Sequence, residues 1–287
     1  MKLATFTEGG RTRIGIVSNG EIVDLAANER LPTVMIDFLA AGDEALDAAR
    51  EVRKKSTDRM ALSSVRLHAP VLRPRKFLAI GGSYGSHLAE VAHLGITRGA
   101  NQTWFNKQVT CVNGPYDDIH LPRVSASLDY EGELAIIIGK GGRHLQGPMA
   151  RAAIAGFTIC NDVSVREWQR RAVTGMIGKS FDTHGPLGPW IVTADELPSA
   201  NHLFLKTWVN DELRQDGNTS DLLYTFEEMV AELSTSFTLE PGDILSTGTP
   251  AGVGIVRNPP LFLKAGDVCR VEIEGIGHIE NRVVPEP

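Results

Sequence analysis

Short runs in which apolar and polar residues alternate dominate the beginning of the chain, and this period of two is typical of β-strands. Residues 2–24 hold three such runs, KLATFT, RIGIVS and EIVDL, separated by Gly9-Gly10 and Asn19-Gly20. Asn-Gly is a favoured two-residue hairpin turn. This segment therefore predicts a small sheet, whereas the spacing of apolar residues over 33–55 predicts one or two helices.

Strand-like patterning also dominates the rest of the chain. From residue 75 onward the apolar runs are short, and helical spacing is confined to about 84–94 and 225–234. A Pro-containing stretch that begins at Pro70 precedes this part. We therefore predict a mostly β protein with α (an α+β fold), divided into a small N-terminal α+β domain at residues 1–70 and a larger β-rich domain at residues 71–287.

Composition and charge indicate a folded protein that does not bind nucleic acid. Apolar residues make up 42% and charged residues 22% of the chain, which is ordinary for a globular protein. The formal net charge of -6 gives no basic field for phosphates. An acidic chain that handles an anionic substrate has to supply positive charge locally, from a metal ion or from a few Lys and Arg residues.

Cysteine usage and hydropathy favour the cytoplasm. The three cysteines, Cys111, Cys160 and Cys269, are an odd number and lack the spacing of a zinc site. The N-terminus has no apolar segment of signal-peptide length, and no run approaches the roughly 20 apolar residues that span a bilayer. We therefore expect a cytoplasmic protein without a membrane partner.

The segment DYEGELAIIIGK contains two acidic residues, Glu131 and Glu133, at the start of a very apolar run. On a strand, residues two apart share a face, and two neighbouring carboxylates repel each other unless a cation lies between them. The pair could equally be the solvated face of an edge strand. Asp162 follows another strand-like run, GFTICN, and a third carboxylate at the same point would suit Mg²⁺ or Mn²⁺.

A second candidate group lies in GGSYGSHLAE, where His87 and Glu90 are three residues apart on a predicted helix. A carboxylate that orients an imidazole makes it a base able to activate water. The alternative is an ordinary surface pair. Gly81-Gly82, just before the helix, suggests a hinge for a lid.

Three further polar residues are candidates because of their place beside strands. Lys179 lies in the Gly- and Pro-rich segment GKSFDTHGPLGPW and could stabilise an oxyanion. Arg166 and Gln169 follow Asp162 and could turn toward the same point if a helix begins there. A solvated loop lysine and ordinary surface polarity are the alternatives. His184, in the same segment as Lys179, borders this group.

Taken together, these segments resemble the fumarylacetoacetate hydrolase family over about residues 75–284. Five motifs occur in the family's order: GGSYGSHLAE, DYEGELAIIIGK, NDVSVREWQ, GKSFDTHGPLGPW and GDILSTGTPAGVG. The resemblance implies a catalytic domain with a rolled mixed β-sheet, assembled as a homodimer. It also implies Mg²⁺ or Mn²⁺ bound by Glu131, Glu133 and Asp162.

The resemblance further assigns roles in catalysis. His87 and Glu90 would activate the water that attacks a carbonyl of a small anionic 2-oxo acid, and Lys179 would stabilise negative charge. Arg166 and Gln169 would orient substrate and water. The remaining expected substrate-binding residues are Thr249, Tyr84 and Lys107, the last two on the wall of the cleft.

Two departures from the family pattern bear on the substrate. Ser83 stands where many members carry Asn, and KFLAIGG lacks the additional acidic ligand of the fumarylacetoacetate hydrolase subgroup. We therefore expect the acylpyruvate or fumarylpyruvate hydrolase-like subgroup of aromatic catabolism, with cleavage of a C–C bond in a 2,4-dioxo acid. The alternatives are decarboxylation of an oxaloacetate-like acid, isomerisation of a 2-hydroxy-dienoate, and a non-catalytic binding module.

Overall fold

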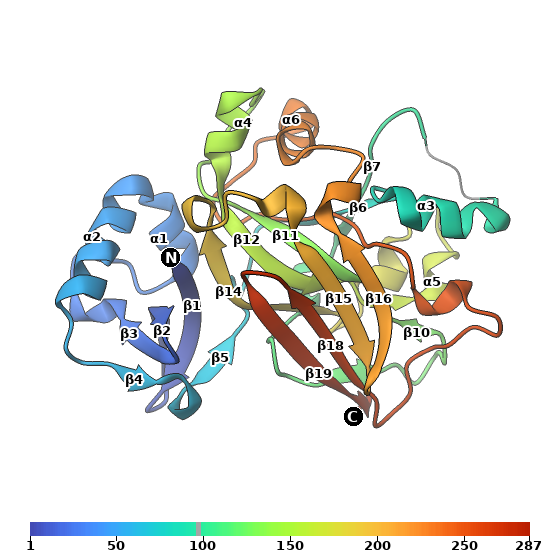
Figure 1. Ribbon diagram of the computed structural model, residues 1–287, viewed down its shortest axis with the longest axis horizontal. Coiled ribbons are helices and arrows are strands. Elements are labelled where there is room, and N and C mark those ends of the chain that lie inside the picture. The colour runs from blue at the N-terminus through green and yellow to red at the C-terminus, as the bar shows by residue number, and fades with distance from the viewer. Residues whose placement is uncertain (96–98) are drawn as a thin grey trace.

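The computed structural model describes residues 1–95 and 99–287, which form three sheets with helices around them (Figure 1). The main sheet has twelve strands in the order β4-β3-β2-β1-β14-β12-β11-β17-β6-β7, with β5 paired to β1 and β8 to β14. Its strands are β1 (Lys2–Glu8), β2 (Arg11–Ser18), β3 (Glu21–Asp24), β4 (Met60–Ala61), β5 (Arg66–His68), β6 (Phe77–Gly81), β7 (Thr103–Lys107), β8 (Val112–Asn113), β11 (Gly132–Ile138), β12 (Ile154–Asn161), β14 (Gly185–Thr193) and β17 (Ile244–Ser246).

Two smaller sheets complete the β structure. A five-stranded sheet, in the order β16-β15-β18-β19-β9, lies in front of β11 and β12 in Figure 1. Its strands are β9 (Ile119–Leu121), β15 (Phe204–Val209), β16 (Glu212–Asn218), β18 (Val268–Ile273) and β19 (Gly277–Pro285). A two-stranded sheet pairs β10 (Leu128–Asp129) with β13 (Ser164–Val165). The predicted mixture of mostly β with some α structure is confirmed.

The α-helices lie at the periphery of the sheets. They are α1 (Met35–Ala40), α2 (Gly42–Lys55), α3 (Gly85–Val91), α4 (Pro148–Ala153), α5 (Arg166–Gln169) and α6 (Phe226–Ser236). The helices expected over 33–55, 84–94 and 225–234 are therefore confirmed. Thr225 begins α6 with a capping box that also uses Glu228, which satisfies amides at the helix start. None of the helices described is long and apolar enough to cross a membrane.

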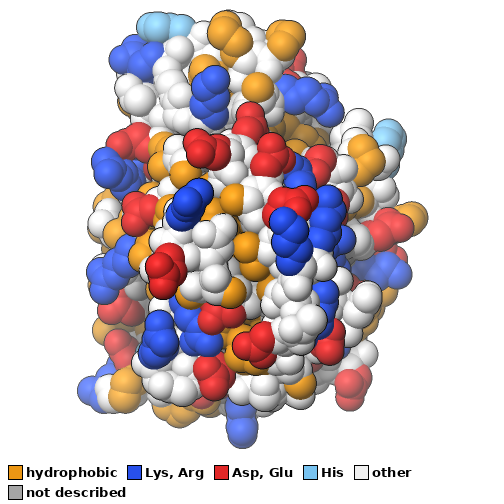
Figure 2. Space-filling model, turned by 90° about the vertical axis from the view of Figure 1, so that its left-hand side faces the viewer, with side chains coloured by type: hydrophobic (Ala, Val, Ile, Leu, Met, Phe, Trp, Pro, Cys, Tyr) orange, Lys and Arg blue, Asp and Glu red, His pale blue; other side chains and the backbone are white. Residues whose placement is uncertain are grey.

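The N-terminal strands extend the main sheet. The three predicted strands are present, and β1 pairs antiparallel with β14 as well as with β2. Figure 1 shows this segment in blue beside α1 and α2. The division at residue 70 stays a prediction. The face in Figure 2 carries interspersed acidic and basic side chains, and ion pairs occur on α2, including Arg50 with Asp47 at 2.6 Å.

Strand β11 is buried on both faces. Leu134 and Ile136 pack in a core cluster with residues of the five-stranded sheet and α6, whereas Ala135 and Ile137 pack in a cluster formed largely by the N-terminal segment. Burial of each of the Leu and Ile side chains stabilises the fold by about 1.5–3 kcal/mol. Glu133 continues the face of Ala135 and Ile137 at the point where that core ends. β11 lies between β12 and β17, so it is no edge strand.

Candidate metal and catalytic site

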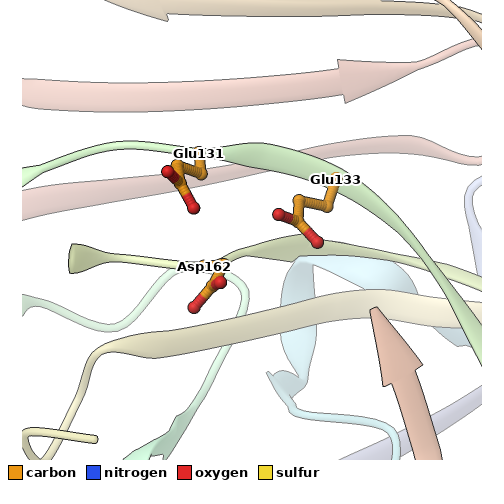
Figure 3. A group of neighbouring side chains, drawn as sticks. All are labelled: Glu131, Glu133 and Asp162. Atoms are coloured by element: carbon orange, nitrogen blue, oxygen red, sulfur yellow. The ribbon is translucent and has the colours of Figure 1, made fainter. Parts of the chain in front are cut away.

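Three carboxylates meet at one end of β11 and β12 (Figure 3). Glu131 directly precedes β11, Glu133 lies in it, and Asp162 directly follows β12. The pairing of these strands and the hydrogen bond from Asp162 N to Glu131 O at 2.8 Å bring the three residues together. One ligand oxygen from each lies within 4.8 Å of the others. The side chains are buried, which excludes the alternative of a solvated edge strand.

Glu131 has two cationic neighbours. Lys179 Nζ donates to Oε2 of this carboxylate, and Arg166 Nη2 lies 2.7 Å from Oε1 as an ion pair without the alignment of a hydrogen bond. Burial alone would raise the pKa of Glu131, but the charges of Arg166 and Lys179 outweigh burial and lower the pKa to about 2. Glu131 is therefore ionised.

Glu133 differs from Glu131 because it has no ion-pair partner in the described part of the chain. Its Oε2 accepts hydrogen bonds from Ser246 Oγ at 2.5 Å and Gly248 N at 2.9 Å. Burial, and after it the charges of Asp162 and Glu131, raise the pKa of Glu133 well above its ordinary value. A buried carboxylate beside two others, with Oε1 not used by these bonds, fits a site for a hard divalent cation with oxygen ligands.

Two buried lysines support Asp162. Lys179 Nζ donates to Asp162 Oδ2 at 2.8 Å, in addition to its bond with Glu131. Lys107 Nζ donates to Asp162 Oδ1 at 2.6 Å, to the carbonyl of His184 at 3.1 Å and to the carbonyl of Lys179. Lys107 thus uses its three donors inside the protein. The structure places it behind Asp162, and not on the wall of a cleft as the resemblance suggested.

Helix α3 places the predicted His and Glu pair on the loop that also binds Glu133. His87 Nδ1 lies 2.7 Å from Glu90 Oε1, and Glu90 Oε2 accepts a hydrogen bond from Gly252 N at 2.8 Å. The two side chains are only 15% and 18% exposed, so they do not form an open surface pair. His87 also influences the pKa of Glu131, so the imidazole lies near the triad. Because Glu90 engages Nδ1, Nε2 is the nitrogen left for chemistry.

The other predicted residues line or support this group. Arg166 Nη1 donates to Gln169 Oε1 at 3.1 Å, so these two side chains meet. Tyr84 is fully buried at the start of α3, and its hydroxyl lies near Thr247 without a hydrogen bond of normal geometry. The Thr249 hydroxyl donates to the carbonyl of Gly132 at 2.9 Å and thereby helps to hold the strand.

Several polar residues of the site were not identified from the sequence. Asp129 accepts a hydrogen bond from Arg166 Nε at 2.8 Å, and Asn161 Oδ1 accepts one from Glu131 N at 3.0 Å. Gln215 Nε2 donates to Thr249 Oγ1 at 2.7 Å. Asp129 lies in the same acidic segment as Glu131, which is a signal that could have found it. Gln215 is 84 residues after Glu131 in numbering and gives no local signal.

A cavity of about 480 Å³ lies apart from this site. It is lined by Phe157 of β12, Phe226 of α6 and Leu222 of the segment before α6, among others, and by none of the predicted site residues. We therefore do not include it in the candidate site.

Known proteins match this chain over the segments that hold the site. The family described as fumarylacetoacetate (FAA) hydrolase C-terminal matches residues 76–284. Oxaloacetate tautomerase Fahd2a, mitochondrial, from Rattus norvegicus is 41% identical over 267 residues, which cover 92% of this chain and 84% of that protein.

Solved structures resemble the whole chain. A fumarylacetoacetate hydrolase from Exiguobacterium antarcticum has a TM-score of 0.86 at 38% identity, with both chains fully covered. Maleylpyruvate hydrolase from Sphingobium sp. SYK-6, in complex with manganese (II) ion and pyruvate, has a TM-score of 0.83 at 34% identity, again with both chains fully covered. A 2-hydroxyhepta-2,4-diene-1,7-dioate isomerase from Mycobacterium marinum has a TM-score of 0.78 at 29% identity, covering 100% of this chain and 99% of that one.

Proposed function

The chain belongs to the fumarylacetoacetate hydrolase family, and we propose that within this family of hydrolases, isomerases and tautomerases it is a divalent-metal-dependent hydrolase that cleaves a C–C bond of a small 2,4-dioxo acid. The observation that carries this proposal is the His87 and Glu90 pair, which is bonded to the same loop as Glu133 of the three buried carboxylates. The cytoplasmic location and the homodimer stay predictions.

Glu131, Glu133 and Asp162 would hold the metal ion. Burial and two neighbouring carboxylates oppose ionisation of Glu133, which a bound cation would relieve, and the related maleylpyruvate hydrolase was solved in complex with manganese (II) ion and pyruvate. Carboxylate oxygens accept Mg²⁺ and Mn²⁺ alike. When bound, either ion supplies a Lewis acid that stabilises negative charge developing on the substrate.

His87 would act as the base. Glu90 accepts a hydrogen bond from Nδ1–H, which leaves the lone pair on Nε2. Nε2 takes a proton from water, and the water oxygen adds to the carbonyl distant from the substrate's carboxylate. The C–C bond then breaks, and its electron pair stays with the 2-oxo acid fragment as an enolate. Nε2 returns the proton to carbon 3 of this fragment. General acid–base catalysis of this kind contributes about 10²- to 10⁴-fold to the rate.

Lys179, Arg166 and Gln169 would position the anionic substrate. The Lys179 ammonium adds a fixed positive charge next to the triad, where it favours negative charge on substrate oxygens. Arg166 fixes the Gln169 carbonyl oxygen, which leaves the Gln169 amide group free to donate to the substrate or to the attacking water.

Tautomerisation of oxaloacetate is the second candidate. It is supported by the 41% identity to the rat oxaloacetate tautomerase. His87 Nε2 could also move a proton between carbon 3 and the enol oxygen without a water. The two reactions share the base and the carboxylates, and they differ in whether water attacks.

Turnover of a substrate panel tests the proposal. Wild type is assayed with acetylpyruvate, fumarylpyruvate, a longer acylpyruvate and oxaloacetate, each with Mg²⁺, Mn²⁺ or EDTA, beside His87→Ala. His93→Ala is the control, because His93 is an exposed histidine shortly after α3. Metal-dependent acylpyruvate cleavage, lost in His87→Ala and kept in His93→Ala, is the expected result. Enol–keto conversion of oxaloacetate alone would favour the tautomerase, CO₂ release the decarboxylase, and no reaction would contradict the proposal.

A further inference from the structure

Backbone amides of one glycine-rich loop, residues 248–255, bind three different carboxylates. The hydrogen bonds are Gly248 N to Glu133 Oε2 at 2.9 Å, Gly252 N to Glu90 Oε2 at 2.8 Å, Gly254 N to Asp129 Oδ1 at 2.8 Å and Ile255 N to Asp129 Oδ2 at 3.0 Å. The loop therefore contacts Glu133 of the candidate metal site and Glu90, the partner of His87 on α3. It also contacts Asp129, which has no role in the proposed mechanism.

The loop packs closely against its neighbours at its glycines. Gly248 and Gly252 have φ values of +89° and +111°, which favour glycine. A Cβ on Gly252 would lie 2.1 Å from the carbonyl oxygen of Arg214, and one on Gly254 would lie 2.2 Å from that of Leu261. Because the loop is packed this closely, a change in its anchor shifts the other amides with it.

Asp129 is the anchor, and it also reaches the triad. Its side chain is fully buried and accepts four N–H groups, two on each oxygen. Oδ1 accepts from Tyr130 N and Gly254 N, and Oδ2 from Arg166 Nε and Ile255 N. Arg166 in turn forms the ion pair with Glu131 at 2.7 Å. The Asp129 carboxylate thus connects two parts of the site. One is the loop at residues 248–255, which contacts α3, and the other is Glu131 of the triad, reached through Arg166.

We propose that Asp129 is a positioning residue that couples docking of α3 to the geometry of the carboxylate triad, an inference that rests on the proposed function. Asn at this position has one oxygen and one NH₂ group. Whichever way the amide is turned, two of the four N–H donors face another donor, and the charge that orients Arg166 is lost. The loop, the docked helix and Glu131 then lose their common support.

Two measurements on Asp129→Asn test this coupling without relying on turnover. Mn²⁺ affinity, measured by calorimetry, is expected to fall about 10- to 100-fold, as for other outer partners of metal ligands. Backbone amide hydrogen exchange over Gly85–Val91 is expected to become faster, because α3 loses its docking surface. Asp243→Asn is the matched control: Asp243 is also fully buried, and it accepts hydrogen bonds from Lys76 and Glu240 at the other end of β11.

The control separates positioning from stability. Both variants are expected to lower the Tm, but only Asp129→Asn weakens Mn²⁺ binding and loosens α3. Equal affinity and equal exchange in the two variants would overturn the coupling. If wild type does not bind Mn²⁺, the proposed function is overturned instead. Amide hydrogen exchange over Gly85–Val91 in the two variants without metal would then be the test of the coupling.

A measurement on wild type covers the case in which Asp129→Asn does not fold. The coupling predicts that saturating Mn²⁺ slows exchange at Gly85–Val91 and at residues 248–255, while α2 (Gly42–Lys55) exchanges as before. Unchanged exchange in both segments on Mn²⁺ binding would refute the inference.

Discussion

Replacing Glu133 with Gln tests whether the three buried carboxylates bind a metal ion. Glu133 is 2% exposed, and in the residues described here it has no ion-pair partner, so a bound cation would balance the charge of its ionised form. Mn²⁺ at one hundred times its dissociation constant stabilises the folded state by about 2.7 kcal/mol. With a Tm change of about 2–4 °C per kcal/mol, we expect Mn²⁺ to raise the Tm of wild type by about 5–10 °C.

The variant should lose most of this gain. If Gln weakens the site about 100-fold, the same Mn²⁺ concentration stabilises the folded state by only about 0.4 kcal/mol, which corresponds to a Tm rise of about 1 °C. Glu167→Gln is the control, because Glu167 is an exposed glutamate on α5. It should retain the full Mn²⁺ shift.

Without metal, Glu133→Gln is expected to be more stable than wild type. Burial, and after it the charges of Asp162 and Glu131, raise the pKa of Glu133 in the folded state. The stability linked to this proton is present below the unfolded pKa of 4.5 and is lost as the pH rises through the raised folded pKa. In EDTA above neutral pH, Glu133→Gln should therefore melt at a higher temperature than wild type, and the gap should close as the pH falls.

Differential scanning fluorimetry across a pH series, with Mn²⁺ or with EDTA, measures both effects. The same Mn²⁺ shift in wild type and Glu133→Gln would refute the assignment of Glu133 as a ligand. A wild type that shows no Mn²⁺ shift would refute the metal site as a whole.

Three further predictions concern residues around the triad. Glu90→Gln should lower kcat by about 10²- to 10⁴-fold in steady-state assays, because His87 Nε2 becomes a weaker base, while calorimetry should show unchanged Mn²⁺ affinity. Lys107→Met should lower the free energy of unfolding, measured with urea, by about 3–5 kcal/mol, because Asp162 Oδ1 and the carbonyls of Lys179 and His184 lose the bonds that Lys107 donates. Burial lowers the pKa of His184 to about 4, so its contribution to stability is present above the unfolded pKa of 6.5 and is lost as the pH falls through about 4. Urea unfolding should show a flatter loss of stability in this acidic range for His184→Gln; an identical slope in wild type would contradict this.

Local pattern was sufficient to predict the elements that carry the site. Period-two alternation identified β1 to β3, and helical spacing identified α3 and α6. The two-residue spacing of Glu131 and Glu133 placed both carboxylates on one face of a strand, and the structure brings them together with Asp162. Such signals lie within a few residues of each other and do not depend on the tertiary fold.

Contacts between distant segments could not be predicted in this way. Nothing near Lys107 indicates that its ammonium meets Asp162 and the carbonyl of His184, because these partners come from other strands and loops. Whether Glu133 or Glu131 lacks a cation likewise depends on where Arg166 and Lys179 lie in space. Sequence spacing predicts which face of a strand or helix a residue lies on. The residues that this face contacts depend on the tertiary fold.

Exchange of the methyl protons of pyruvate in D₂O, followed by NMR with Mg²⁺, tests the central claim most directly. Both candidate reactions require His87 to move a proton at carbon 3 of a 2-oxo acid held at the triad. We predict exchange in wild type with Mg²⁺, none above background in EDTA, and a loss of about 10²- to 10⁴-fold in His87→Ala. Exchange that continues at the wild-type rate in His87→Ala, or in EDTA, would contradict the claim.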